Sequence, residues 1–154
     1  MPISPSLAQS LALAAQACGA CRDPWWVIGS AAMALAGLED IEVADVDLLT
    51  STADAPCVAA ALDATPPVGK ADGDHFRSCF FTTDATPLDI EIMGDLEVMS
   101  NGAWTSVRPR TRRAVKVASA VFFIPEVAEQ IDILRLFGRP KDLARAEKLG
   151  SLQP

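Results

Sequence analysis

Residues 25–50 read WWVIGSAAMALAGLEDIEVADVDLLT, and this stretch decides the fold class of the chain. The apolar run at 25–28 is typical of a short buried strand. Gly29-Ser30 then turns the chain into an alanine-rich helix expected over 31–36, and residues 43–50 return as a second strand. Strands that alternate with helices in this way predict a sheet with helices packed on it, in the α/β or α+β class.

Two acidic residues, Asp45 and Asp47, lie inside the second predicted strand. Side chains two positions apart on a strand share a face, so both carboxylates project together while Val46 and Leu48 point into the core. Neighbouring negative charges repel, and Asp is uncommon in strands. A divalent cation would explain the pair, because Mg²⁺ takes carboxylate ligands together with phosphate oxygens. The alternative is an exposed strand end with two solvated acids.

Gly29 and Ser30 precede the Asp pair, with fourteen residues between Ser30 and Asp45. A glycine at a strand-to-helix turn lets a phosphate approach the backbone, and the start of the helix offers free N–H groups. The Ser30 hydroxyl adds a further donor. The alternative for this pair is an ordinary helix N-cap.

Two more acids, Asp89 and Glu91, alternate with apolar residues in a later predicted strand. A sheet that places this strand beside residues 43–50 would bring a third carboxylate to Asp45 and Asp47. Three carboxylates next to a phosphate-binding helix start would form a phosphoryl-transfer site with two metal positions.

These residues, in this order, resemble the nucleotidyltransferase superfamily, the fold shared by DNA polymerase beta and the aminoglycoside and lincosamide nucleotidyltransferases. In addition, Gly138-Arg-Pro-Lys141-Asp142-Leu is similar to the Lys-Asp motif of nucleotidyltransferase-like toxins of the AbiE type. The resemblance implies an α/β (α+β) fold in which a mixed β-sheet is flanked by helices. It also implies that residues 1–154 form a single nucleotidyltransferase-like domain.

The resemblance assigns metal-binding and catalytic roles to four acidic residues. Asp45, Asp47 and Asp89 would hold Mg²⁺, and a third carboxylate would orient or deprotonate the acceptor hydroxyl. We prefer Asp89 to Glu91 as that third carboxylate, although both face the same side of the strand and strand register decides between them.

The resemblance also implies which residues bind the nucleotide. Gly29, Ser30 and Lys141 would contact a nucleoside triphosphate, expected to be ATP, and the nucleotidyl group would pass to a hydroxyl of a small molecule, a protein or tRNA. Lys141 and Arg145 lie four apart on one face of a predicted helix, where they would either neutralise phosphate or form a solvated basic face.

Charge and composition restrict the partners and the compartment. The net charge is −7, with −12 over residues 1–100 and +5 over residues 101–154. An acidic chain is a poor general nucleic-acid binder, and the basic run at 108–116 has no interleaved aromatic residues, so we prefer a solvated loop there to a nucleic-acid contact, for example to tRNA. The charge-free stretch at 24–38 is too short and mixed for a membrane span. Together with four cysteines expected to be unremarkable free thiols, this predicts a cytoplasmic protein.

The other expected elements follow from periodicity and turn residues. Helices are expected at 4–19, 54–64, 125–137 and 140–149, strands at 76–83, 87–93, 96–99, 104–108 and 121–124, a loop at 66–74, and turns at 94–95 and 101–102.

Two other functions stay open: an inactive nucleotidyltransferase-fold binding or regulatory module, for example of a toxin–antitoxin system, and a structural domain with surface acids. The short chain also leaves open a homodimer that completes the site.

Overall fold

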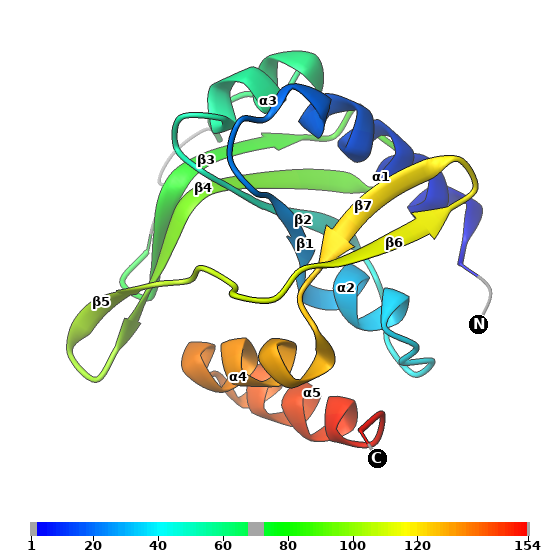
Figure 1. Cartoon of the computed structure of the whole chain (residues 1–154). Coiled ribbons are helices and arrows are strands. Elements are labelled where there is room, and N and C mark those ends of the chain that lie inside the picture. Colours follow the sequence, from blue (N-terminus) through cyan, green and yellow to red (C-terminus); the bar gives the residue numbers. More distant parts are fainter. Residues whose placement is uncertain (1–2, 68–72, 154) are drawn as a thin grey trace.

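A mixed five-stranded sheet lies between helices in the computed structural model, which describes residues 3–67 and 73–153 (Figure 1). The strand order is β1-β2-β4-β3, and β5 pairs with β4. β2 and β4 are parallel, whereas the other pairs are antiparallel. The strands of this sheet are β1 Trp26–Ile28, β2 Asp45–Thr50, β3 Phe76–Thr83, β4 Asp89–Ser100 and β5 Ala103–Ser106.

Helices cover both faces of the sheet, and a separate hairpin pairs β6 (Arg113–Val117) with β7 (Ala120–Ile124). Figure 1 shows α1 and α3 on one side of the sheet, and α4 with α5 on the other. The helices are α1 Pro5–Ala17, the 3-10 turn η1 Cys18–Ala20, α2 Gly29–Leu35, α3 Ala55–Ala61, α4 Val127–Phe137 and α5 Pro140–Gly150. The predicted fold class, a mixed sheet flanked by helices, is confirmed.

The alternation of apolar and polar residues along β2 and β4 gives the sheet one fully buried face. Val46, Leu48, Ile90 and Ile92 are fully buried, and they pack against α1, α3 and β7. The residues between them in the chain therefore point to the opposite face, because successive side chains of a strand alternate. This opposite face carries the acidic residues and is covered by α4 and α5.

The residues that connect α4 to α5 end the first helix and begin the second on the acidic face. Gly138 ends α4 with φ 72, a conformation that favours glycine, and Pro140 is the first residue of α5. The backbone N–H of Arg139 donates to the Asp142 carboxylate and so caps the start of α5. Lys141, Asp142 and Arg145, from the first half of α5, line a pocket together with residues of β2 and β4.

Two sequence predictions for the strands differ from the structure, and the first concerns Gly94-Asp95. The turn expected there is wrong, because β4 continues through both residues to Ser100. A Cβ atom on Gly94 would lie 3.0 Å from the Cβ of Ala55 and from the Cα of Thr52. Close packing beneath α3, rather than a change of direction, therefore requires this glycine. The hairpin predicted at Asn101-Gly102 is confirmed between β4 and β5.

The second correction concerns the basic run at 108–116, which is not simply a solvated loop. Arg113–Val117 forms β6, and the guanidinium of Arg112 lies 3.4 Å from the ring centroid of Phe123. The half-buried positions of β6 alternate with exposed ones, and this alternation was hidden by the density of charge. Of the loop predicted at 66–74, residues 68–72 lie outside the described residues.

Within residues 3–67 and 73–153, no helix combines the length and the apolar character that crossing a lipid bilayer requires. The four cysteines are free thiols.

Candidate functional site

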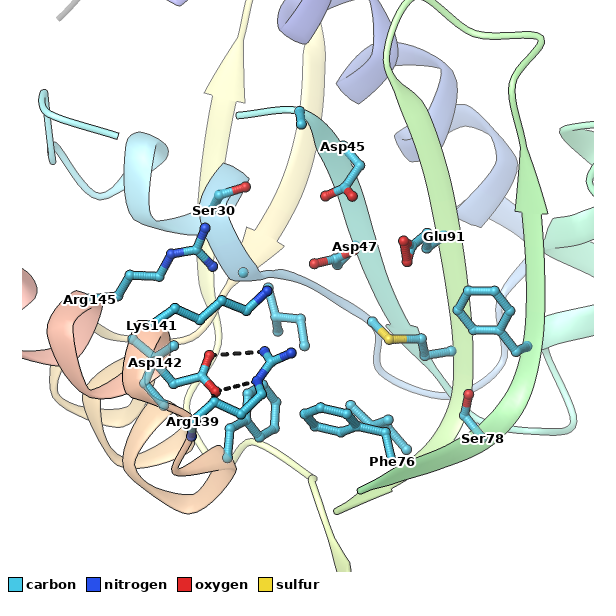
Figure 2. A pocket seen from close by; sticks show the side chains of 18 of the residues that line it. Ser30, Asp45, Asp47, Phe76, Ser78, Glu91, Arg139, Lys141, Asp142 and Arg145 are labelled. Carbon is cyan, nitrogen blue, oxygen red and sulfur yellow. Dashed lines mark hydrogen bonds and ion pairs between the residues drawn. The ribbon is translucent and has the colours of Figure 1, made fainter. Parts of the chain in front are cut away.

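Three carboxylates meet on the acidic face of the sheet. The parallel pairing of β2 with β4 sets Asp47 opposite Glu91, and Asp45 lies two residues earlier on the same face. Asp45, Asp47 and Glu91 each offer an oxygen atom, and these atoms lie within 4.8 Å of one another. Figure 2 shows the three side chains converging from the two strands. We call this group the carboxylate triad.

Asp89, the residue preferred from the sequence as the third carboxylate, is not a member of this triad. The register pairs it with Asp45 at the beginning of the two strands, where its side chain is exposed to solvent. Asp89 still acts on the site through its charge, because it raises the pKa of Asp45. The register between β2 and β4, which the sequence left open, thus places Glu91 rather than Asp89 with Asp45 and Asp47.

Negative charge on the triad is energetically unfavourable, because all three carboxyl groups have raised pKa values. Burial, together with the charges of Asp45 and Glu91, raises the pKa of Asp47 to about 8. Burial also raises the pKa of Asp45 and of Glu91, again reinforced by neighbouring carboxylates. A divalent cation would relieve both effects, and three clustered carboxylates are a donor set that suits Mg²⁺.

Gly29 allows Asp47 to occupy its position. Its φ of 73 lies in the left-handed region, and a Cβ atom there would lie 2.5 Å from Oδ2 of Asp47. Both observations require glycine. Ser30 follows at the start of α2, is buried, and lines the same pocket (Figure 2).

The start of α5 brings positive charge to the triad. Lys141 and Arg145 extend toward it in Figure 2, and both charges lower the pKa of Asp45 and of Asp47. The sequence left open whether these residues form a solvated face; in the structure they line the pocket with the carboxylates. Within the described residues, none of the triad carboxylates forms an ion pair, so the basic side chains lie near without closing on them.

Arg139 is held apart from the other two basic residues. Its Nε and Nη2 donate to the two carboxylate oxygens of Asp142 at 2.6 and 3.0 Å, and Asp142 is 1% exposed. Its guanidinium also lies 4.9 Å from the ring centroid of Phe76. Asp142 therefore holds Arg139 in a defined position within the pocket.

Sequence reasoning missed the apolar half of the pocket. The whole pocket has a volume of about 510 Å³. Its apolar lining includes Phe76, Phe80, Met93, Leu96 and Phe137, which come from β3, β4 and the end of α4. The alternation of Phe76, Ser78 and Phe80 along one strand was the available signal for a shared face.

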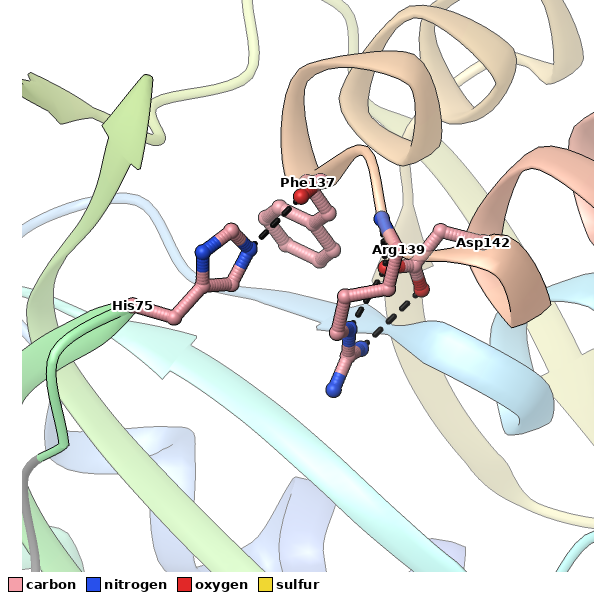
Figure 3. A network of polar contacts seen from close by, with 4 residues as sticks. All are labelled: His75, Phe137, Arg139 and Asp142. Carbon is pink, nitrogen blue, oxygen red and sulfur yellow. Dashed lines mark hydrogen bonds and ion pairs between the residues drawn. The ribbon is translucent and has the colours of Figure 1, made fainter. Parts of the chain in front are cut away.

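His75, the residue before β3, links two sides of this pocket. Its Nε2 donates to the backbone carbonyl of Phe137 at 2.6 Å, which ties the start of β3 to the end of α4 (Figure 3). Its ring also meets the ring of Phe76 edge-on, with centroids 4.6 Å apart. His75 is therefore a structural contact between the sheet and α4.

Comparison with protein-family models and with curated proteins finds no match for this chain. Solved structures do match. A candidate nucleotidyltransferase from Thermotoga maritima superposes with a TM-score of 0.77 at 20% identity, over 99% of this chain and 97% of that one. The lincosamide antibiotic adenylyltransferase LnuA, solved with lincomycin, gives a TM-score of 0.52 at 13% identity, over 84% of this chain and 87% of that one.

The antibiotic-resistance enzyme ANT(2″)-Ia, solved in complex with adenylyl-2″-tobramycin, gives a TM-score of 0.51 at 12% identity, over 90% of each chain. At these identities the likeness is one of fold. The nucleotidyltransferase fold expected from the sequence is confirmed.

Proposed function

We propose that this chain, which has the nucleotidyltransferase fold, is a Mg²⁺-dependent nucleotidyltransferase. It would move a nucleoside monophosphate from a nucleoside triphosphate, ATP in the first instance, to a hydroxyl group. The observation that carries the proposal is the carboxylate triad, whose oxygens lie within 4.8 Å of one another in a pocket shared with Lys141 and Arg145.

Each residue of the site has a role that follows from its position. Asp45, Asp47 and Glu91 would hold Mg²⁺, which supplies the positive charge that lets a triphosphate approach the carboxylates. Ser30 and the backbone of Gly29 would contact the triphosphate. Lys141 would neutralise its terminal phosphates, with Arg145 beside it, because both extend over the triad from α5.

The chemical step is a displacement at the α-phosphorus. The acceptor oxygen forms a bond to phosphorus, the bond from phosphorus to the bridging oxygen of the β-phosphate breaks, and pyrophosphate leaves. The hydroxyl proton passes to a carboxylate. We assign this base to Glu91, because Glu91 lies on the side of the triad away from Ser30 and Lys141 (Figure 2). A nucleophile that attacks in line must enter from that side when pyrophosphate leaves toward Lys141.

The test separates nucleotide binding from turnover. Binding of labelled ATP, GTP, CTP and UTP with Mg²⁺ is measured by equilibrium dialysis, and transfer is measured as pyrophosphate release with a panel of hydroxyl compounds. We expect Glu91→Gln to reduce turnover about 10²- to 10⁴-fold, the range of a lost general base. Asp89→Asn should change it far less, and Asp132→Asn, at an exposed position of α4, is the matched control.

Two results would contradict this proposal. One is the absence of any nucleotide binding by the wild-type protein, and the other is binding that Asp45→Asn and Asp47→Asn leave unchanged. If Asp89→Asn abolished turnover while Glu91→Gln did not, the roles assigned to these two residues would be reversed.

The alternatives from the sequence make different structural demands. An inactive regulatory module would have carboxylates too far apart to share a metal ion or salt-bridged to basic segments, and a structural domain would expose Asp45 and Asp47 to open solvent. The triad instead is compact and lines a pocket. Nucleotide binding without transfer to any acceptor would favour the inactive module.

The acceptor we propose is a small molecule. The pocket volume of about 510 Å³ is of the size that holds small ligands. ANT(2″)-Ia and LnuA, which share the fold, were solved with an adenylylated aminoglycoside and a lincosamide. The cytoplasmic location, the single domain over residues 1–154 and the homodimer remain predictions.

A further inference from the structure

The pocket is divided into a charged half and an apolar half. The charged half contains the carboxylate triad, Ser30 and the basic residues of α5. The apolar half, which we call the apolar wall, is formed by Phe76, Phe80, Met93, Leu96 and Phe137. In Figure 2, Ser30, Lys141 and Arg145 approach the triad from one side, Glu91 and Ser78 lie toward the other side, and Phe76 lies below the triad beside Arg139.

The apolar wall begins directly beside Glu91. Met93 follows Glu91 on the same face of β4, and Phe80 of β3 is paired with Met93. A hydroxyl held at Glu91 therefore has its carbon atoms over Met93 and Phe80. With the triphosphate on the opposite side of the triad, the group that contacts this wall is the acceptor.

The shape of the wall is set before any ligand binds. The rings of Phe76 and Phe137 meet edge-on with centroids 5.0 Å apart, and His75 bonds to the carbonyl of Phe137 (Figure 3). Arg139, held by Asp142, covers the Phe76 ring. The aromatic rings at this end of the pocket are therefore already fixed and present their edges and faces to a ligand. Little side-chain entropy is lost when a ligand packs against them.

The charge of the wall excludes a polycationic acceptor. The described acidic residues that line the pocket offer it no spare carboxylate: Asp45, Asp47 and Glu91 form the triad assigned to Mg²⁺, both oxygens of Asp142 accept hydrogen bonds from Arg139, and Glu42 precedes β2, outside the wall. An aminoglycoside carries several ammonium groups, which would lose water here and gain no carboxylate in exchange.

We propose that the acceptor is a neutral hydroxyl compound with a ring system or a bulky aliphatic group next to its hydroxyl, and that this apolar group binds against Phe76, Phe80, Met93 and Phe137. The inference rests on the proposed function. The acceptor oxygen bonds to the α-phosphorus, its proton passes to Glu91, and pyrophosphate leaves on the far side.

The experiment uses the full chain with Mg²⁺ and α,β-methylene-ATP, a nucleotide that cannot be turned over. Binding of naphthylethanol and of tobramycin to this complex is measured by saturation-transfer NMR. The decisive variant is Phe80→Leu, and the matched control is Phe81→Leu, the next residue of β3, whose side chain packs against the core on the other face.

We expect naphthylethanol to bind more tightly than tobramycin, and Phe80→Leu to weaken naphthylethanol about tenfold, the effect of lost apolar contact in a pocket. The affinity for the ATP analogue should stay within about twofold for the same variant, because the phosphate contacts lie across the triad. Phe81→Leu should change neither affinity.

Three outcomes would overturn the inference: no naphthylethanol binding to the nucleotide complex, tighter binding of tobramycin, or a Phe80→Leu variant that weakens the ATP analogue instead, which would make the wall a nucleobase site. Failure of the proposed function has a different signature. If the proposed function is wrong, the ATP analogue does not bind to the wild-type protein, or it binds with equal affinity to the Asp47→Asn variant. Either result is independent of the effect of Phe80→Leu.

Discussion

Replacing Asp47 by asparagine should stabilise the metal-free protein while it removes the metal site. Asparagine keeps the shape of the side chain and carries no charge. Burial and two neighbouring carboxylates raise the pKa of Asp47 from 3.8 to about 8. At pH 8 such a shift corresponds to at most about 5 kcal/mol of lost stability. Water in the open pocket screens part of this, so we expect the variant to gain about 2 kcal/mol.

The sign of the pH dependence follows from proton binding. Between about pH 4 and pH 8 the folded state keeps the Asp47 proton that the unfolded state has lost, so the stability of the wild-type protein falls as the pH rises. The stabilisation by Asp47→Asn should therefore be small near pH 4 and fully developed at pH 8. Added Mn²⁺ should stabilise the wild-type protein at pH 8 and have little effect on the variant.

Urea unfolding at pH 5 and pH 8, in EDTA and in Mn²⁺, measures these effects. A gain of about 2 kcal/mol would raise the Tm by about 4–8 °C in a chain of this size. Asp89→Asn is the control, because Asp89 is exposed and its removal should stay within about 0.5 kcal/mol. An Asp47→Asn variant that is less stable than the wild-type protein at pH 8 in EDTA, or equally stabilised at both pH values, would refute the electrostatic reasoning.

Gly29→Ala should lower the free energy of unfolding by at least about 1–2 kcal/mol, because alanine is strained at φ 73, and it should weaken Mn²⁺ binding because the new Cβ displaces the Asp47 carboxylate. Urea titration and calorimetric Mn²⁺ titration measure the two effects, and unchanged Mn²⁺ affinity would contradict the second. Lys141→Met should raise the Kd for triphosphate about tenfold with little change in stability. Lys148→Met, on the same helix but paired with Asp40, should leave the nucleotide Kd unchanged, and equal effects of the two variants would argue against a specific phosphate contact. In addition, Lys141→Met should shift the pH above which Mn²⁺ binds upward, because Lys141 lowers the pKa of Asp45 and Asp47.

Local sequence signals were sufficient for the strand, the turn and the Asp pair at 25–50. Side-chain alternation along a strand and the φ freedom of glycine are properties of a few consecutive residues. Asp45 and Asp47 therefore share a face in the structure as predicted, with Val46 and Leu48 buried behind them. The hairpin at Asn101-Gly102 was predictable for the same reason.

The same kind of signal failed where glycine serves packing. Gly94 resembles a turn residue in the sequence, but its neighbours in space are Ala55, Thr52 and Cys79, all distant in the chain. A local reading cannot separate a glycine that bends the backbone from one that lets another element approach.

Tertiary structure alone decided how the site is completed. The choice of Glu91 over Asp89 depends on the register between β2 and β4, which is set by long-range packing of the buried face rather than by either strand. The meeting of Lys141 with the carboxylates joins segments about a hundred residues apart, and it follows from how α4 and α5 pack on the sheet. Chain-local chemistry thus determined which oxygens could bind a cation, whereas the packing of remote elements determined which charges and which apolar surface surround it.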